Sequence, residues 1–205
     1  MKKVLRDALS LTVIAVILGV LLGTFHEITK KPIENRERQT KTEALMDVLP
    51  DADKFEKINI SDKKTEFQSL LKKDGLDAQI IDEVYRGLTN SGNFSGYAIT
   101  VTSREGYGGD IQMTVGLTKD GTTAGISFLQ LNETAGLGMN ADTNDFKKQF
   151  KNKKVDAFEY TKDGGGSENQ IDAISGATVT TNAVTNAVNA CIDVSEILNG
   201  EAIES

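Results

Sequence analysis

The chain has 205 residues, a length that allows one globular domain with short appendages. Its net charge of -7 argues against a nucleic-acid partner, because binding to phosphates needs clustered Lys and Arg side chains. The single cysteine, Cys191, and the single histidine, His26, are too few for an internal disulfide or for a zinc or iron–sulfur site. We therefore expect no metal site in this chain.

The first strong signal is an uncharged run of 18 residues near the N-terminus, residues 8–25, ALSLTVIAVILGVLLGTF. A run of this length is sufficient for one transmembrane helix. A cleaved signal peptide is the alternative, but the residues that follow Gly23 do not form the small-x-small site that cleavage needs. We predict a retained transmembrane helix over residues 8–25, preceded by a cytoplasmic tail over residues 1–7.

The positive-inside rule does not decide the orientation of this helix, because basic residues lie on both sides of it. A long C-terminal domain can cross the membrane largely regardless of such charges, so a cytoplasmic N-terminus is permitted. The basic residues are Lys2, Lys3 and Arg6 before the run, and Lys30, Lys31, Arg36 and Arg38 after it.

The next segment, residues 29–48, is charged and rich in helix-favouring residues, with Pro32 near its start and Pro50 beyond its end. Proline is favoured in the first turn of a helix and beyond its end, so we predict a juxtamembrane helix within residues 26–50. Residues 51–83 are polar and lysine-rich, and their pattern favours no particular element.

Alternating apolar residues then predict a meander of three strands, over residues 94–106, 110–121 and 122–133. Asp120–Gly121 is typical of a tight hairpin whose central residues both have positive φ. The sequence GYGG, residues 106–109, resembles a nucleotide-binding loop, but its position between two strands favours a simple turn.

The chain continues with a predicted short helix over residues 142–150 and a predicted strand over residues 155–160. The glycine-rich stretch DGGGSENQ, residues 163–170, is interpreted as a flexible loop, because no strand-to-helix context supports a phosphate-binding role.

The last element is an amphipathic helix that we expect to end at Asn199–Gly200, where glycine is a typical stop signal. Cys191 lies on its apolar stripe and is expected to be a buried structural thiol. Strands followed by helices predict an α+β domain, an antiparallel sheet with flanking helices, within residues 51–200. The stripe comprises Val184, Ala187, Val188, Cys191, Val194 and Leu198.

The start of this helix, DAISGATVTTNAV at residues 172–184, is consistent with two uses. Ser175 or a threonine hydroxyl could cap the first turn. A helix N-terminus also stabilises anions, so a phosphate near Thr178 would be favoured, and Gly176 and Ala177 would let it approach the backbone closely. Ser175 as a hydrolase nucleophile is rejected, because His26 adjoins the membrane helix and the G-x-S-x-G context is absent.

Two motifs carry a resemblance to a known family. Residues 172–178, DAISGAT, resemble the D-x-x-S/T-G-A-T motif of FMN-binding domains whose final threonine is joined to the flavin by a phosphoester. Residues 133–138, ETAGLG, are similar to the family motif E-T-P-G-L-G, with Ala135 where proline is common. Together with the N-terminal anchor, the whole chain resembles the G subunits of Rnf ion-translocating ferredoxin:NAD oxidoreductases. The C subunits of sodium-pumping NADH:quinone reductases share the domain, but their chains are usually longer.

The resemblance implies FMN joined through its phosphate to Thr178, in an FMN-binding domain at about residues 90–198. It implies a membrane-anchored electron carrier with no catalytic residue of its own and no turnover alone, an extracytoplasmic domain over residues 51–200, and other subunits of the complex as partners. A flavin transferase that uses FAD and Mg²⁺ would attach the FMN and recognise Asp172. The alternatives are a C-type subunit of a sodium-pumping NADH:quinone reductase and a non-redox, membrane-anchored binding module. The implied cofactor-binding residues besides Thr178 are Asp172, Ser175, Gly176, Ala177, Glu133, Thr134, Gly136, Leu137 and Gly138.

Overall fold

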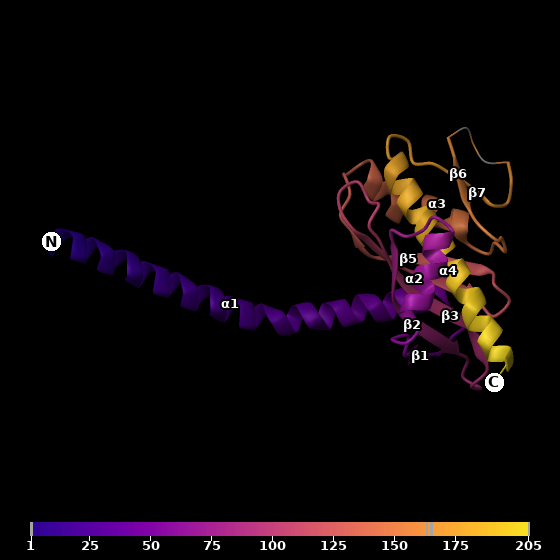
Figure 1. Ribbon diagram of the computed structural model, residues 1–205, viewed down its shortest axis with the longest axis horizontal. Helices are drawn as coiled ribbons and strands as arrows, with labels where there is room; N and C mark the ends of the chain where they lie inside the picture. Colours follow the sequence, from indigo (N-terminus) through magenta and orange to yellow (C-terminus); the bar gives the residue numbers. More distant parts are fainter. Residues whose placement is uncertain (1, 163, 165, 205) are drawn as a thin grey trace. The chain divides into compact units, whose positions relative to one another are not determined.

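The computed structural model describes residues 2–162, 164 and 166–204, and their contacts divide the chain between Lys41 and Thr42 into two units. Figure 1 gives the order of the elements, and each unit is described by itself.

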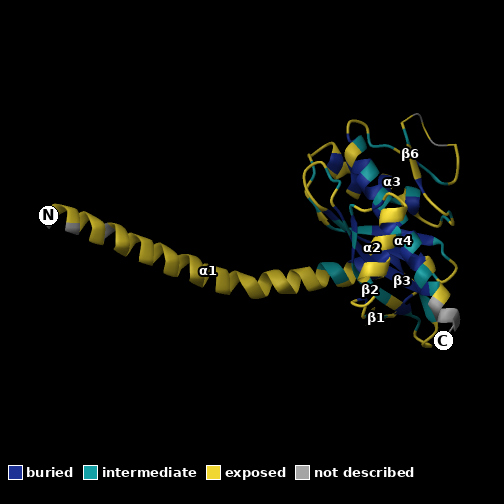
Figure 2. Ribbon diagram, viewed as in Figure 1, coloured by how far each residue is buried: buried dark blue, intermediate teal, exposed yellow. Residues whose placement is uncertain are grey.

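One long helix, α1 (Lys2–Val48), contains all the described residues of the N-terminal unit. Among the described residues it is the helix that is long and apolar enough to cross a membrane, and its large apolar side chains from Leu9 to Ile33 are exposed (Figure 2). Residues 29–48, predicted to form a juxtamembrane helix, are helical as the last part of α1, which runs through Pro32 without a break. Proline removes one backbone hydrogen bond inside a helix, and the helix-favouring residues on both sides of Pro32 continue the helix across it.

The C-terminal unit is built on a five-stranded antiparallel sheet in the order β1-β2-β3-β4-β5. The three predicted strands are confirmed as β3, β4 and β5. Strand β1 and helix α2 lie in the polar stretch over residues 51–83 that favoured no element, and strand β2 begins at its end. The bounds are β1 (Lys54–Ile58), α2 (Lys64–Lys73), β2 (Gln79–Leu88), β3 (Phe94–Ser103), β4 (Ile111–Thr118) and β5 (Thr123–Leu131).

The C-terminal helix α4 (Thr178–Glu204) and α2 cover one face of this sheet (Figure 1). Successive side chains of a strand point to opposite faces, so Tyr97 and Ile99 of β3 belong to the large core under α4. Cys191 is fully buried in the same core, as predicted. Burial raises the pKa of its thiol well above the usual value, which fits a structural role.

The last turns of α1, which belong to the C-terminal unit, pack on the opposite face of the sheet. Leu45, Val48 and Leu49 form a second cluster with Ala98 of β3 and with Ala124 and Ala52. A side chain at Gly116 of β4 would collide with the carbonyl oxygen of Val48. Small residues on this face therefore allow the helix backbone to approach the sheet closely.

Short elements connect β5 to α4. The predicted helix over residues 142–150 is three short pieces, and Thr143 caps the middle one by accepting a hydrogen bond from the Phe146 N–H. The predicted strand over residues 155–160 overlaps β6 only at its end, and β6 pairs in parallel with β7. The pieces are η1 (Gly138–Asp142), α3 (Asn144–Lys147), η2 (Lys148–Phe150), β6 (Glu159–Thr161) and β7 (Gln170–Asp172).

Three sequence expectations about turns and ends have different outcomes. Helix α4 continues through Gly200 to Glu204, so the predicted glycine stop was wrong. The predicted hairpin turn between β4 and β5 is present, closed by a hydrogen bond from the Thr118 N–H to the Thr122 carbonyl, and Gly121 but not Asp120 has positive φ. Residues 163 and 165 of the predicted flexible loop lie outside the described residues.

Candidate functional site

The two sequence motifs meet at one cavity of about 510 Å³, within the usual range for small-molecule sites. One side of the cavity comes from the start of α4, and the other side comes from the segment after β5. The lining residues are Tyr107, Glu133, Thr134, Leu137, Gly138, Gly176, Ala177, Thr178, Val179 and Thr180.

The SGAT segment makes a turn directly before α4. Gly176 has φ of 73°, which favours glycine, and the Ala177 N–H donates to the Ile174 carbonyl at 2.9 Å. A Cβ atom at Gly176 would lie 3.0 Å from the Leu137 side chain, so the two motifs are in contact. Thr178 begins the helix beside the cavity, and the N–H groups of the first turn have no partner within the helix.

Thr181, which the family motif does not include, ties the turn to the helix. Its buried hydroxyl accepts a hydrogen bond from the Ile174 N–H at 3.0 Å and donates to the Ala177 carbonyl at 3.0 Å. This hydroxyl therefore bonds a peptide group ahead of the helix and does not cap the first turn in the expected way. Ser175 is exposed and does not line the cavity.

The ETAGLG segment turns tightly on the other side. Gly136 has φ of 76°, and the Thr134 carbonyl accepts hydrogen bonds from the N–H groups of Leu137 and Met139. Gly138 is buried, and a Cβ atom there would lie 2.7 Å from both Glu133 Oε2 and Thr180 Oγ1. Glycine at 138 is therefore required for Glu133 and α4 to lie this close together.

Glu133 connects the ETAGLG segment to the loop between β3 and β4. Its Oε1 atom accepts a hydrogen bond of 2.8 Å from the Tyr107 N–H. The Tyr107 side chain is 75% exposed and lines the cavity. Sequence reasoning missed Tyr107, because the GYGG sequence between two strands indicates a turn and gives no sign that a residue in it also lines a cavity. Its aromatic residue between glycines was the available signal.

Seven of the ten predicted site residues line the cavity, and three do not. Asp172 lies in β7 with an exposed side chain, and Gln149 holds its backbone by hydrogen bonds to the N–H at 2.7 Å and to the carbonyl at 3.3 Å. The three residues outside the lining are Asp172, Ser175 and Gly136.

The donor set of the cavity indicates what it can bind. The described residues that line it include one carboxylate, Glu133, and neither Lys nor Arg. An anionic group would therefore rely on the N–H groups and dipole at the start of α4. The partly exposed apolar side chains of Leu137 and Val179, with Tyr107, offer surfaces for a flat aromatic ring.

Comparisons with known proteins identify the family. Residues 106–193 match the FMN-binding domain family. The G subunit of the proton-translocating ferredoxin:NAD(+) oxidoreductase complex of Clostridium ljungdahlii is 33% identical over 184 residues, or 90% of this chain and 87% of the relative. The G subunit of the Na(+)-translocating complex of Acetobacterium woodii is 34% identical over 203 residues, or 97% of this chain and 94% of the relative. This chain belongs to the G-subunit family of ion-translocating oxidoreductase complexes.

A solved structure agrees with this assignment at the level of the fold. NqrC of Shewanella oneidensis is similar with a TM-score of 0.51 and 21% identity, over 60% of this chain and 61% of that chain. The match to the FMN-binding domain family supports FMN as the cofactor of the domain, and the family together with the apolar helix supports membrane association.

The residues of the cavity fit FMN. A flavin needs apolar or aromatic surfaces for its ring, an acceptor for its N–H or hydroxyl groups, and donors for its phosphate. The surfaces for the ring come from Tyr107, Leu137 and Val179, and the acceptor is the Glu133 carboxylate. The donors for the phosphate are the N–H groups at the start of α4.

Proposed function

We propose that this chain is a membrane-anchored flavoprotein subunit that carries electrons through FMN in an ion-translocating ferredoxin:NAD oxidoreductase complex. The observation that carries the proposal is the convergence of ETAGLG and SGAT, about 40 residues apart in sequence, on one cavity beside Thr178. The identity of 33–34% to G subunits over nearly the whole chain supports the placement in such a complex.

The work of the chain is to hold the flavin, because FMN supplies one- and two-electron chemistry when bound. Tyr107, Leu137 and Val179 would exclude water from the ring, and Glu133 would accept a hydrogen bond from it or from its side chain. The first turn of α4 would stabilise the phosphate charge. No residue of the chain has to transfer a proton or act as a nucleophile during electron transfer.

The FMN is joined covalently to Thr178 in this proposal. The Thr178 Oγ1 atom forms a bond to the FMN-side phosphorus of FAD, the P–O–P bond of FAD breaks, AMP leaves, and the hydroxyl proton passes to a base of the flavin transferase. A phosphodiester carries less negative charge than the free phosphate of FMN. This difference suits a cavity whose described lining residues include a carboxylate and neither Lys nor Arg.

The surroundings of Thr178 support attachment at this residue. Its side chain is partly exposed at the cavity, whereas those of Thr180 and Thr181 are 1% and 0% exposed. An acceptor hydroxyl must reach the bound FAD of another protein, which a buried hydroxyl cannot do. The exposed side chains of Asp172 and Ser175 lie on the segment that leads to Thr178, where a transferase would recognise the acceptor.

The topology of the proposal is a cytoplasmic N-terminus, one membrane crossing within residues 8–25 and an extracytoplasmic domain. Other integral and peripheral subunits would pass electrons to and from the flavin, and the chain alone would show no turnover. A covalent bond would keep the flavin from being lost on the side of the membrane that has no cytoplasmic cofactor pool.

The test is co-expression of the full chain with a flavin transferase, followed by in-gel flavin fluorescence after denaturation. Wild-type protein and Thr180→Ala should fluoresce, and Thr178→Ala should be folded by circular dichroism but dark. A wild-type protein that is colourless under these conditions would contradict the proposal and favour a non-redox binding module. A fluorescent Thr178→Ala band would contradict only the attachment site.

A further inference from the structure

The loop that carries Tyr107 is held from a side of the domain that does not line the cavity. Glu105, two residues before Tyr107, accepts two hydrogen bonds on the same oxygen, Oε2. The Asn186 amide of α4 donates one at 2.8 Å, and the Gln79 amide at the start of β2 donates the other at 2.7 Å. One carboxylate thus connects the loop, the helix and the sheet.

These bonds are of the stronger kind, because a carboxylate accepts them in a partly buried setting. Gln79 is fully buried, and its Oε1 atom has no hydrogen-bond partner among the described residues. Leaving an amide oxygen unpaired in a core costs free energy. The hydrogen bonds that the Gln79 and Asn186 amides donate to Glu105 offset this cost.

The middle of the loop is held by a second carboxylate, Glu133, whose Oε1 atom accepts a hydrogen bond from the Tyr107 N–H at 2.8 Å. Between the two carboxylates, a Cβ atom at Gly106 would collide with the Gly109 carbonyl and would lie 2.9 Å from Ile111 Cγ1. The peptide between Glu105 and Tyr107 therefore has little freedom to move.

Helix α4 relates this loop to the flavin attachment residue. Thr178 is its first residue and Asn186 follows eight positions later, which is slightly more than two turns on one rigid element. The same helix therefore fixes both Thr178 and, through Glu105, the loop that carries Tyr107.

We infer that Asn186 and Glu105 are positioning residues that hold Tyr107 against the flavin bound at the cavity. The inference rests on the proposed function. Without the Asn186–Glu105 bond, the Tyr107 ring would lose its fixed position relative to Thr178, while the attachment chemistry at Thr178 would remain intact.

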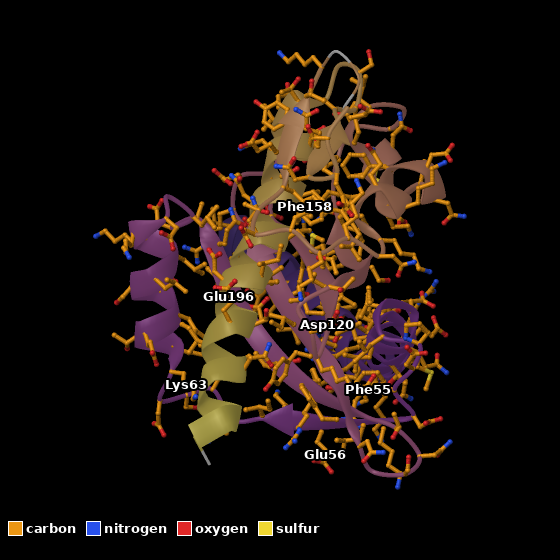
Figure 3. All side chains as sticks on the ribbon, turned by 90° about the vertical axis from the view of Figure 1, so that its right-hand side faces the viewer. Phe55, Glu56, Lys63, Asp120, Phe158 and Glu196 are labelled. Carbon is orange, nitrogen blue, oxygen red and sulfur yellow. The ribbon has the colours of Figure 1, made fainter. Side chains whose placement is uncertain are left out.

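The chain offers a matched control on the same helix, one turn away from Asn186. Asn189 also bonds a loop, accepting the Phe158 N–H at 2.8 Å and donating to the Phe158 carbonyl at 2.9 Å. Figure 3 shows Phe158 beside the upper part of α4. Asn186→Ala and Asn189→Ala each remove an asparagine that holds a loop, but only Asn186→Ala frees the loop of Tyr107.

The experiment measures three properties of the full chain in detergent, with Tyr107→Ala as the reference for loss of the ring. They are covalent flavin in the denatured band, flavin fluorescence and midpoint potential of the native protein, and hydrogen exchange of the peptide over residues 104–110. A tyrosine ring in contact with a flavin quenches its fluorescence. Asn186→Ala should keep the covalent label, brighten the native flavin toward the level of Tyr107→Ala, shift its potential and speed exchange over residues 104–110.

Asn189→Ala should leave these properties at wild-type values even if its thermal stability falls as much as that of Asn186→Ala. Equal native fluorescence, potential and loop exchange in Asn186→Ala and wild type would overturn the inference. Loss of the covalent label in the wild-type protein would instead contradict the proposed function. Loop exchange can be measured before flavin is attached, which separates the two failures.

An exchange of groups tests the same bond if Asn186→Ala does not fold. Asn186→Asp places two carboxylates together and should brighten the flavin and loosen the loop. Adding Glu105→Gln restores an amide–carboxylate pair in the reverse sense and should return both readouts toward wild type. Failure of the double variant to improve on Asn186→Asp would overturn the assignment.

Discussion

Thr178 differs from the hydroxyl residues around it in what its side chain faces. Ser175 is exposed outside the cavity lining, Thr180 is buried against Gly138, and Thr181 is buried and bonded on both sides. Thr178 alone among these four combines a place in the lining with partial exposure. The family motif ends on this residue, and the geometry gives a physical reason for that choice.

The first residue-scale prediction concerns Thr181. Thr181→Ala should retain the covalent flavin, because the hydroxyl is not the acceptor. It should lower the free energy of unfolding by about 1–3 kcal/mol, since the Ile174 N–H loses its partner. Thermal unfolding and in-gel fluorescence measure the two effects, and Thr180→Ala is the comparison. A stable Thr181→Ala protein without flavin would contradict this division of roles.

A second residue-scale prediction concerns Asp193 of α4, a partly buried carboxyl near Asp74 and Glu196. Burial first, and then the charges of these two neighbours, raise its pKa to about 6 from a usual value of 3.8. Because the folded protein binds the proton more tightly than the unfolded chain, Asp193 destabilises the fold above pH 6. The penalty is relieved as the pH falls from about 6 to 4.

Asp193→Asn should therefore raise the unfolding temperature at pH 7.5, and the gain should disappear near pH 4. The side chain is partly solvent-exposed, so screening limits the gain to about 1 kcal/mol or less, or about 2–4 °C. Thermal unfolding at both pH values is the measurement. An equal gain at pH 7.5 and pH 4 would show that titration of Asp193 is not its cause.

At the scale of elements, the end of α1 is held to the sheet by close backbone packing. A side chain at Gly116 would collide with the Val48 carbonyl, whereas a Cβ atom at Gly125, its partner in β5, would meet the helix backbone only at 3.9 Å. Gly116→Ala should therefore cost about 1–3 kcal/mol of stability through overpacking. Gly125→Ala should be neutral or slightly stabilising. Equal unfolding temperatures for the two variants would contradict this packing.

The elements that the sequence predicts best are those whose patterns are set by burial on one side. Strands β3 to β5 and the stripe on α4 carry regular apolar periodicity because they form the core. Strand β1 was missed because its segment is rich in lysine and has only partly buried residues at Phe55 and Ile58. Strand β2 has no lysine, but a register shift between Ile81 and Glu83 breaks the regular alternation of its apolar residues. The signal for a helix start at Pro32 and the signal for a helix end at Gly200 were overridden by the helical residues on both sides.

The part of the candidate site that the sequence predicts is the part formed by the two short motifs, ETAGLG and SGAT. Seven of the motif residues do line one cavity. The contribution of Tyr107, and of Glu105 and Asn186 behind it, depends on contacts between segments 26 to 81 residues apart. The spacing of residues in the sequence does not reveal such contacts, so they can be identified only from the folded structure.

At the scale of the whole molecule, the chain joins one apolar helix to a domain whose cavity fits a flavin. Helix α1 continues without interruption from the apolar segment to Val48, which packs on the sheet. In the proposed function this arrangement keeps the flavin domain attached to the membrane complex, while the covalent bond keeps the flavin in the domain.

The central claim is tested most directly by peptide mass mapping of the full chain from a native membrane that contains the complex. The account predicts that the peptide containing residues 172–184 carries the added mass of FMN less one water, with fragmentation placing it on Thr178. An unmodified Thr178, with FMN bound covalently to another residue, would contradict the attachment site. A chain that carries no flavin would contradict the central claim itself.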